Sequence, residues 1–263
     1  MALSSTEERM ADAGPRGRFV WFDLMTTDQA GAIDFYTKIT NWGTTVWEGP
    51  SPYTMWTNGG TALGGIMPLA PEAEAPPHWL AYISSPDTDA TVVEANKLGA
   101  KTVVAPTDIP TVGRFAVMSD PQGAVFAIYT PAEGAPGHDG PPAVGEFSWH
   151  ELMTTDQAAA FEFYQRLFGW EKGQSMDMGP VGVYQIYRRN GVDLGGMFNR
   201  PSDQPGGPAW LHYIMVKDIK RAAEATKEHG GQVINGPMEV PGGDWIFQAV
   251  DPQGAMFAVH AKA

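Results

Sequence analysis

The chain has 263 residues, a formal net charge of −13 and no cysteine. Without thiols it cannot form disulfides, thiolate metal sites or iron–sulfur clusters, and it has no cysteine nucleophile. The 30 acidic residues outnumber the 17 basic ones, which opposes binding to a phosphate backbone, so nucleic acid is not an expected partner. No apolar run reaches the about 18 residues of a membrane-spanning helix, and we expect no membrane partner.

The first elements are expected in the order strand, helix and three strands. Residues 1–17 are polar and lack a secretory signal pattern, so they predict a disordered leader and a cytoplasmic protein. The alternating apolar residues 18–25 predict a half-buried strand. Thr27 or Asp28 can cap a helix whose apolar residues then recur at helical spacing. The three strands are expected at residues 44–47, 53–57 and 62–67.

The same order restarts at residue 79. A strand is expected at residues 79–84, a helix at 88–98, and strands at 101–104, 114–119 and 124–130. A β-α-β-β-β module therefore occurs twice before residues 132–144, which are rich in Pro and Gly. Such a composition predicts an extended linker between two domains.

The second half of the chain repeats the first. The segment WFDLMTTDQAGAIDFY, residues 21–36, reappears as WHELMTTDQAAAFEFY at 149–164, and DPQGAVFAIY at 120–129 reappears as DPQGAMFAVH at 251–260. The sequence thus predicts four modules in tandem domains at 18–131 and 145–263, each of a size that can bury a core. The expected fold is α+β, with mixed sheets curved around concave clefts and helices on the outer face.

The first strand, the D-x-x-x-A-x-x-F-Y helix and the closing D-P-x-G strand resemble the vicinal oxygen chelate superfamily. That superfamily includes glyoxalase I, extradiol dioxygenases and bleomycin resistance proteins. The resemblance covers residues 18–261 and implies tandem glyoxalase-like domains. It also implies that an enzymatic member would hold a divalent metal with His, Glu or Gln from the first, fourth, fifth and eighth strands.

The positions that the resemblance assigns to metal ligands carry other residue types. They hold Trp21 and Trp149 on the first strand, Leu80 and Leu211 on the fifth, and Ala127 and Ala258 on the eighth. The fourth strand offers a glycine pair flanked by Leu63 and Ile66 in one copy and by Leu194 and Met197 in the other. Indole and aliphatic groups cannot ligate a metal, so the sequence predicts no metal and no cofactor.

Strand alternation places residues two apart on the same face, which pairs Trp21 with Asp23 and Trp149 with Glu151. The predicted ligand-binding residues are Trp21, Asp23, Tyr82, Tyr129, Trp149, Glu151, Tyr213 and His260. An aromatic cleft with few polar groups favours a small aromatic or cationic ligand. The alternative is that these aromatic side chains fill a solid core.

The remaining histidines and glycines favour structural roles. His150 and His212 are one residue out of phase with the ligand positions, and their counterparts are Phe22 and Ala81, so they are expected to be hydrogen-bonded core residues. His260 faces the cleft by parity and, with Glu151, is the best remnant of a catalytic or metal pair. The glycine pairs 64–65 and 195–196 predict close strand approach or a bulge.

The leading functional hypothesis is a metal-free small-molecule binder acting in sequestration, resistance or sensing, as the likeness to bleomycin resistance proteins implies. One alternative is a lyase or dioxygenase whose metal ligands have moved to Glu151, His260, His150 and His212. Another is a metal-independent enzyme using Asp23 or Glu151 as a base. No catalytic residue is assigned, and whether the protein is an enzyme is left open.

The two copies are expected to pair within a monomer, or to form a weak homodimer.

Overall fold

The computed structural model describes residues 16–49, 51–70, 75–134, 136–201 and 206–263. The predicted leader, residues 1–17, lies outside this part of the chain except for its last two residues. Every helix in the described ranges is too short or too polar to cross a membrane.

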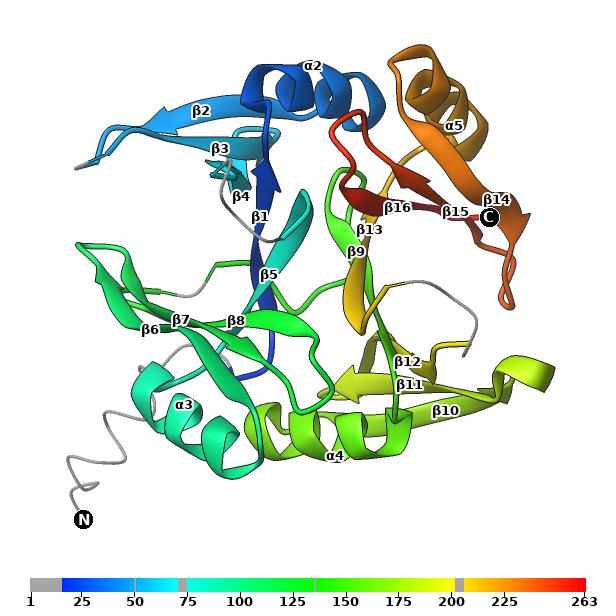
Figure 1. Ribbon diagram of the computed structural model, residues 1–263. Coiled ribbons are helices and arrows are strands. Elements are labelled where there is room, and N and C mark those ends of the chain that lie inside the picture. The colour runs from blue at the N-terminus through cyan, green and yellow to red at the C-terminus, as the bar shows by residue number, and fades with distance from the viewer. Residues whose placement is uncertain (1–15, 50, 71–74, 135, 202–205) are drawn as a thin grey trace. The chain divides into compact units, whose positions relative to one another are not determined.

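The elements follow the four predicted modules in chain order (Figure 1). The first module is β1 (Phe19–Thr26), α2 (Gln29–Thr40), β2 (Gly43–Trp47), β3 (Tyr53–Asn58) and β4 (Thr61–Pro68). The second is β5 (His78–Ser84), α3 (Thr88–Lys97), β6 (Lys101–Ile109), β7 (Gly113–Ser119) and β8 (Val125–Pro131).

The second repeat has the same order of elements. Its first module is β9 (Phe147–Thr154), α4 (Gln157–Phe168), β10 (Glu171–Asp177), a short 3-10 turn (Gly179–Val181), β11 (Val183–Arg189) and β12 (Val192–Asn199). Its second is β13 (Ala209–Met215), α5 (Ile219–Glu228), β14 (Gln232–Glu239), β15 (Trp245–Val250) and β16 (Met256–Ala261).

The strands form two open eight-stranded mixed sheets, which confirms the predicted α+β class. Their orders are β2-β3-β4-β1-β5-β8-β7-β6 and β10-β11-β12-β9-β13-β16-β15-β14. The pairings β1 with β4, β5 with β8, and β13 with β16 are parallel, and hairpin neighbours are antiparallel. Both sheets therefore repeat one topology.

Aspartates fix the starts of the helices. The Asp28 side chain accepts a hydrogen bond from the Gly31 amide at 3.0 Å, so Asp28 rather than Thr27 caps α2. Asp156 caps α4 in the same way through the Ala159 amide, also at 3.0 Å. A carboxylate at this position satisfies an amide that the helix leaves without a partner.

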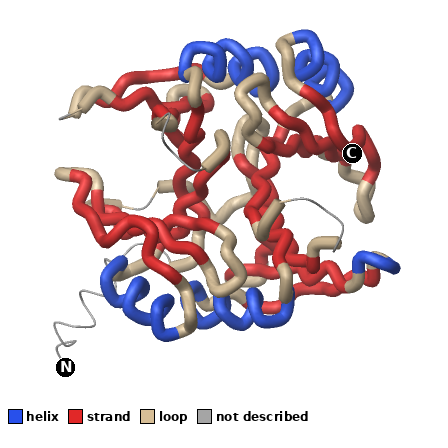
Figure 2. The backbone as a smooth tube through the Cα atoms, viewed as in Figure 1, coloured by secondary structure: helices blue, strands red, loops and turns tan. Residues whose placement is uncertain are grey.

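The structure divides into two compact units that cross the repeats. The α2–α5 unit comprises Trp21–Leu80, Asp139–His150 and Leu211–Ala263; the α3–α4 unit comprises Ala81–His138 and Glu151–Trp210 with the residues up to Val20. Each unit therefore combines one module of the first repeat with one of the second. Within each unit the two helices lie side by side, outside its strands (Figure 2).

A buried tyrosine links the two repeats inside the α2–α5 unit. The Tyr36 hydroxyl donates to Asp251 Oδ2 at 3.1 Å and accepts from Trp79 Nε1 at 3.0 Å. Asp251 Oδ1 accepts from the amides of Gln253 and Ala255, which closes the D-P-Q-G turn. The carboxylate thus holds a turn of the second repeat against a helix of the first.

The α3–α4 unit contains the equivalent arrangement with the repeats exchanged. Tyr164 donates to Asp120 Oδ2 at 3.0 Å and accepts from Trp210 Nε1 at 3.1 Å. Asp120 Oδ1 accepts from the amides of residues 122–124. The predicted tight turn is confirmed in both repeats, and its aspartate additionally anchors a core tyrosine.

Candidate functional site

Two predicted site residues of β1, Trp21 and Asp23, meet Tyr53 of β3 in the α2–α5 unit. Trp21 Nε1 lies 3.0 Å from Asp23 Oδ1 and 2.9 Å from the Tyr53 hydroxyl, and that hydroxyl donates to the same carboxylate oxygen. Asp23 is only 5% exposed, whereas Trp21 and Tyr53 are half-buried. A buried carboxylate needs such donors, because losing water without them is costly.

The glycine pair on β4 explains how Tyr53 reaches the carboxylate. In the sheet, Gly65 lies opposite Asp23 of β1 on one side and Met55 of β3 on the other. Tyr53 is two residues from Met55, on the same face of its strand. A Cβ on Gly65 would overlap the Tyr53 hydroxyl, and one on Gly64 would overlap the Phe22 carbonyl oxygen. The predicted close strand approach is confirmed.

The second repeat carries the same pair in the α3–α4 unit. The Tyr184 hydroxyl donates to Glu151 Oε1 at 2.8 Å. A Cβ on Gly196 would overlap the Tyr184 ring, just as Gly65 leaves room for Tyr53. The carboxylate–tyrosine pair is therefore present in both repeats.

Replacing Gly196 by alanine is expected to push the Tyr184 ring away from Glu151. The added methyl has to displace an aromatic ring, and such overpacking costs about 1–3 kcal/mol. We expect a lower melting temperature in a thermal scan and a changed tyrosine environment in near-ultraviolet circular dichroism. Gly207→Ala in the same unit is the control, because a Cβ there meets nothing within 4 Å. Equal behaviour of the two variants would contradict this role of Gly196.

The other predicted residues are divided between the units. Trp21, Asp23, Trp149, Tyr213 and His260 belong to the α2–α5 unit, and Tyr82, Tyr129 and Glu151 belong to the α3–α4 unit. The buried Tyr129 donates to the Val112 carbonyl at 2.9 Å. The Tyr213 hydroxyl accepts from Gln248 at 2.8 Å, and the Tyr82 ring lies 6.1 Å from that of Phe115.

His260 lies in a chain of polar groups that the sequence did not predict. Its Nε2 is 2.9 Å from Asp244 Oδ2 and its Nδ1 is 2.9 Å from Ser148 Oγ. Lys262 also reaches Asp244, at 2.8 Å. Desolvation raises the pKa of the Asp244 carboxyl, but hydrogen bonds from Lys262 and His260 outweigh it, so this pKa lies below its usual value.

His150 and His212 form a buried pair, as predicted. They are 6% and 3% exposed, their Nδ1 atoms are 3.1 Å apart, and Phe22 stacks on His150. Burial lowers the pKa of His212 to about 3. Burial, and next the neighbouring His212, place the pKa of His150 well below its usual value. Both rings are neutral at neutral pH, and one of them donates to the other.

Tyr53 and Tyr184 are the site residues that the sequence analysis missed. They occupy equivalent positions in the two repeats, and each lies 11 residues before the first glycine of the pair. Both repeats have a tyrosine at this distance before a glycine pair. Such a repeated pattern can predict that the tyrosine side chain lies over the glycine of the neighbouring strand. For Asp244 and Ser148 no comparable spacing exists.

The family is decided by comparison with known proteins. The family model described as "Glyoxalase/Bleomycin resistance protein/Dioxygenase superfamily" matches residues 18–128 and 146–259. The chain belongs to this superfamily. "Putative glyoxylase CFP32" of Mycobacterium tuberculosis is 34% identical over 252 residues, covering 92% of this chain and 94% of that protein. Anthracycline biosynthesis protein DnrV of Streptomyces peucetius is 30% identical over 261 residues, covering 92% of each.

Solved structures of the superfamily share the fold. Homoprotocatechuate 2,3-dioxygenase from Arthrobacter globiformis matches with a TM-score of 0.68 and 13% identity, over 95% of this chain and 81% of that one. The Mn(II)-bound glyoxalase from Novosphingobium aromaticivorans matches with a TM-score of 0.64 and 16% identity, over 95% and 83%. At these identities the likeness concerns the fold alone.

The side chains present do not fit the metal site of the superfamily's enzymes. Across the described ranges, no three His, Cys, Asp or Glu side chains come together as a metal would require. The expected ligand position on β1 holds Trp21, whose indole nitrogen donates to Asp23. His150 and His212 are held in a neutral core pair, and His260 is engaged by Asp244 and Ser148.

Proposed function

We propose that the protein binds a small planar organic molecule, with an aromatic or cationic group, without using a metal. The observation that carries the proposal is the carboxylate–tyrosine pair present in both repeats, Asp23 with Tyr53 and Glu151 with Tyr184. Each pair places a hydrogen-bonded carboxylate among aromatic side chains. That combination orients a flat ligand by charge and holds it by stacking.

The half-buried Trp21 makes the first of these pairs the stronger candidate. Its indole nitrogen is fixed by Asp23 and Tyr53, which leaves the ring in one orientation. An aromatic ring held this way loses little conformational freedom on binding. Binding at this site would serve sequestration, resistance or sensing of the ligand.

The relatives suggest which compounds to test first. DnrV is named for anthracycline biosynthesis, and anthracyclines are planar polycyclic compounds. We propose an aromatic polyketide of this kind as the ligand class. Within that class, a compound with an amino sugar adds the cation that Asp23 would favour.

The experiment is calorimetric titration of the tag-free protein with an anthracycline, its neutral aglycone and an aliphatic amine. We expect the anthracycline to bind most tightly. Asp23→Asn should weaken that binding by about tenfold to a hundredfold, the scale of a lost charge-assisted contact. Glu151→Gln is the matched variant in the other repeat and reports whether the second pair also binds. If no planar compound binds, or if Asp23→Asn binds as well as the wild type, the proposal fails.

A second candidate, metal-independent proton transfer, is favoured by the direct bond from the Tyr53 hydroxyl to Asp23. A buried carboxylate that is held in place by a phenol can act as a base toward an acidic C–H group of a bound ligand. Exchange of such a ligand proton for solvent deuterium, followed by NMR, tests this. The exchange should be lost in Asp23→Asn. Stoichiometric metal in protein purified without chelators would instead favour a metal-dependent lyase or dioxygenase.

A further inference from the structure

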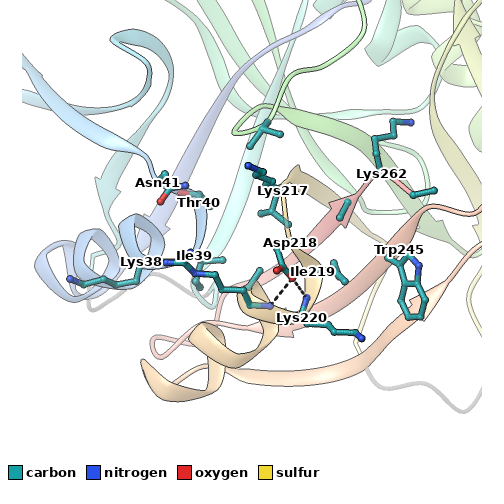
Figure 3. A pocket seen from close by; sticks show the side chains of 16 residues that line it. Lys38, Ile39, Thr40, Asn41, Lys217, Asp218, Ile219, Lys220, Trp245 and Lys262 are labelled. Atoms are coloured by element: carbon teal, nitrogen blue, oxygen red, sulfur yellow. Dashed lines mark hydrogen bonds between the residues drawn. The ribbon is translucent and has the colours of Figure 1, made fainter.

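A cavity lies in the α2–α5 unit, where the last turn of α2 meets the start of α5. It has a volume of about 640 Å³, within the range of small-molecule sites. Figure 3 shows side chains reaching it from the end of α2, from the segment before α5, and from β15 and the residues after β16. It shares no residue with the Trp21–Asp23–Tyr53 site.

The side chains around this cavity are mainly positively charged, whereas the chain as a whole has a net negative charge. Its basic lining residues are Lys38, Lys217, Lys220, Arg221 and Lys262. The chain has only 17 Lys and Arg and a net charge of −13, so nearly a third of its cations line one cavity. Like charges repel, so an anionic ligand in this cavity would offset that repulsion.

The acidic side chains nearby do not neutralise this cluster. Asp218 is the acidic residue of the lining, and its Oδ1 accepts from the amides of Lys220 and Arg221, so it serves as the α5 cap. Lys262 pairs with Asp244. For Lys38, Lys217, Lys220 and Arg221 the structure shows no ion pair with any described residue. Four exposed cations therefore surround the cavity.

The rest of the lining suits a molecule with both charged and flat parts. Ile39, Val216 and Ile219 are buried and form an apolar floor. Trp245 stands on the side of the cavity nearest Lys262 (Figure 3). Indole is the best stacking and cation–π surface among side chains. The cavity thus offers an anion-binding rim next to an aromatic surface.

We propose that this cavity binds a small polyanion whose phosphate groups are attached to a planar ring, the chemistry of a nucleoside polyphosphate. The phosphates lie among the lysines and Arg221, which are strong donors to phosphate oxygens. The ring stacks on Trp245. Because the first amides of α5 are taken by Asp218, the cationic side chains and not the helix end supply the anion contacts.

The test is calorimetric titration of the tag-free chain, at low salt, with ATP, inorganic triphosphate and adenosine. ATP and triphosphate should each saturate one site, ATP more tightly, whereas adenosine should bind far more weakly. Higher salt should weaken both anions. The double variant Lys217→Ala and Lys220→Ala should lose at least about tenfold in affinity for both. Trp245→Leu should weaken ATP and leave triphosphate unchanged.

Lys227→Ala is the matched control, because Lys227 lies on the same helix but outside the cavity. It should bind like the wild type. The proposal is overturned if neither anion shows saturable binding, or if the double variant and the Lys227 variant behave alike. Equal effects of Trp245→Leu on ATP and triphosphate would overturn the assignment of the ring to Trp245.

Discussion

Replacing Asp251 by alanine is expected to lower the free energy of unfolding by about 3–5 kcal/mol. The Asp251 carboxylate accepts hydrogen bonds from the Gln253 and Ala255 amides and from the Tyr36 hydroxyl, at 2.9, 2.8 and 3.1 Å. Alanine leaves these donors without an acceptor in a buried region, at about 1–3 kcal/mol for each donor that water cannot reach. Denaturant unfolding at neutral pH measures the loss.

Two further variants test whether the loss of stability comes from the hydrogen bonds of the Asp251 carboxylate. Asp251→Asn keeps an oxygen that can accept from the turn amides, so it should lose less than Asp251→Ala. Asp34→Ala, at an exposed position on α2, should change the free energy of unfolding by no more than about 0.5 kcal/mol. A loss below about 1 kcal/mol in Asp251→Ala would show that the Tyr36–Asp251 contact does not stabilise the α2–α5 unit.

Asp120→Ala should have a comparable effect in the α3–α4 unit, where Asp120 holds Tyr164.

Desolvation is the main cause that raises the pKa of both aspartates, Asp120 and Asp251, above the usual value. Folding therefore favours their protonated forms. Between pH about 4 and the folded-state pKa, raising the pH therefore lowers the free energy of unfolding, while the hydrogen bonds that the ionised carboxylates accept remain in place at neutral pH. These two carboxyls do not cause unfolding in acid.

The modules could be predicted from the sequence because their signals are local and occur twice. Alternation predicted β1 and β9, and the polar residues before the first apolar helix predicted its cap, with Thr27 and Asp28 as alternatives. The composition of the compact units could not be predicted in this way. It depends on contacts such as Tyr36 with Asp251, which are 215 residues apart.

The candidate site was predicted in part for a similar reason. Strand parity identified Asp23 and Glu151, because parity is a property of one strand. Tyr53 and Tyr184 reach those carboxylates across a neighbouring strand at a glycine, and that crossing depends on sheet register. The partners of His260 come from other strands, so its own position carried no information about Ser148 or Asp244.

Acid should unfold the protein through the buried histidine pair. Burial lowers the pKa of His150 and His212 in the folded state, that of His212 to about 3, whereas the unfolded chain binds protons at about pH 6.5. The pair's stabilising contribution is therefore present above pH about 6.5 and is lost as the pH falls toward the folded-state pKa. The loss is about 1.4 kcal/mol per pH unit for each histidine that titrates only on unfolding.

The double variant His150→Phe and His212→Ala tests this, because it copies the first repeat, which has Phe22 and Ala81 at the equivalent positions. We expect the free energy of unfolding, measured by denaturant titration from about pH 7 to about pH 4, to fall much less steeply in this variant than in the wild type. The slope is the readout, because the substitutions also change packing and shift the absolute value. His229→Ala, at an exposed position, should keep the wild-type slope. If the double variant keeps that slope too, other groups bind the protons that unfold the chain in acid.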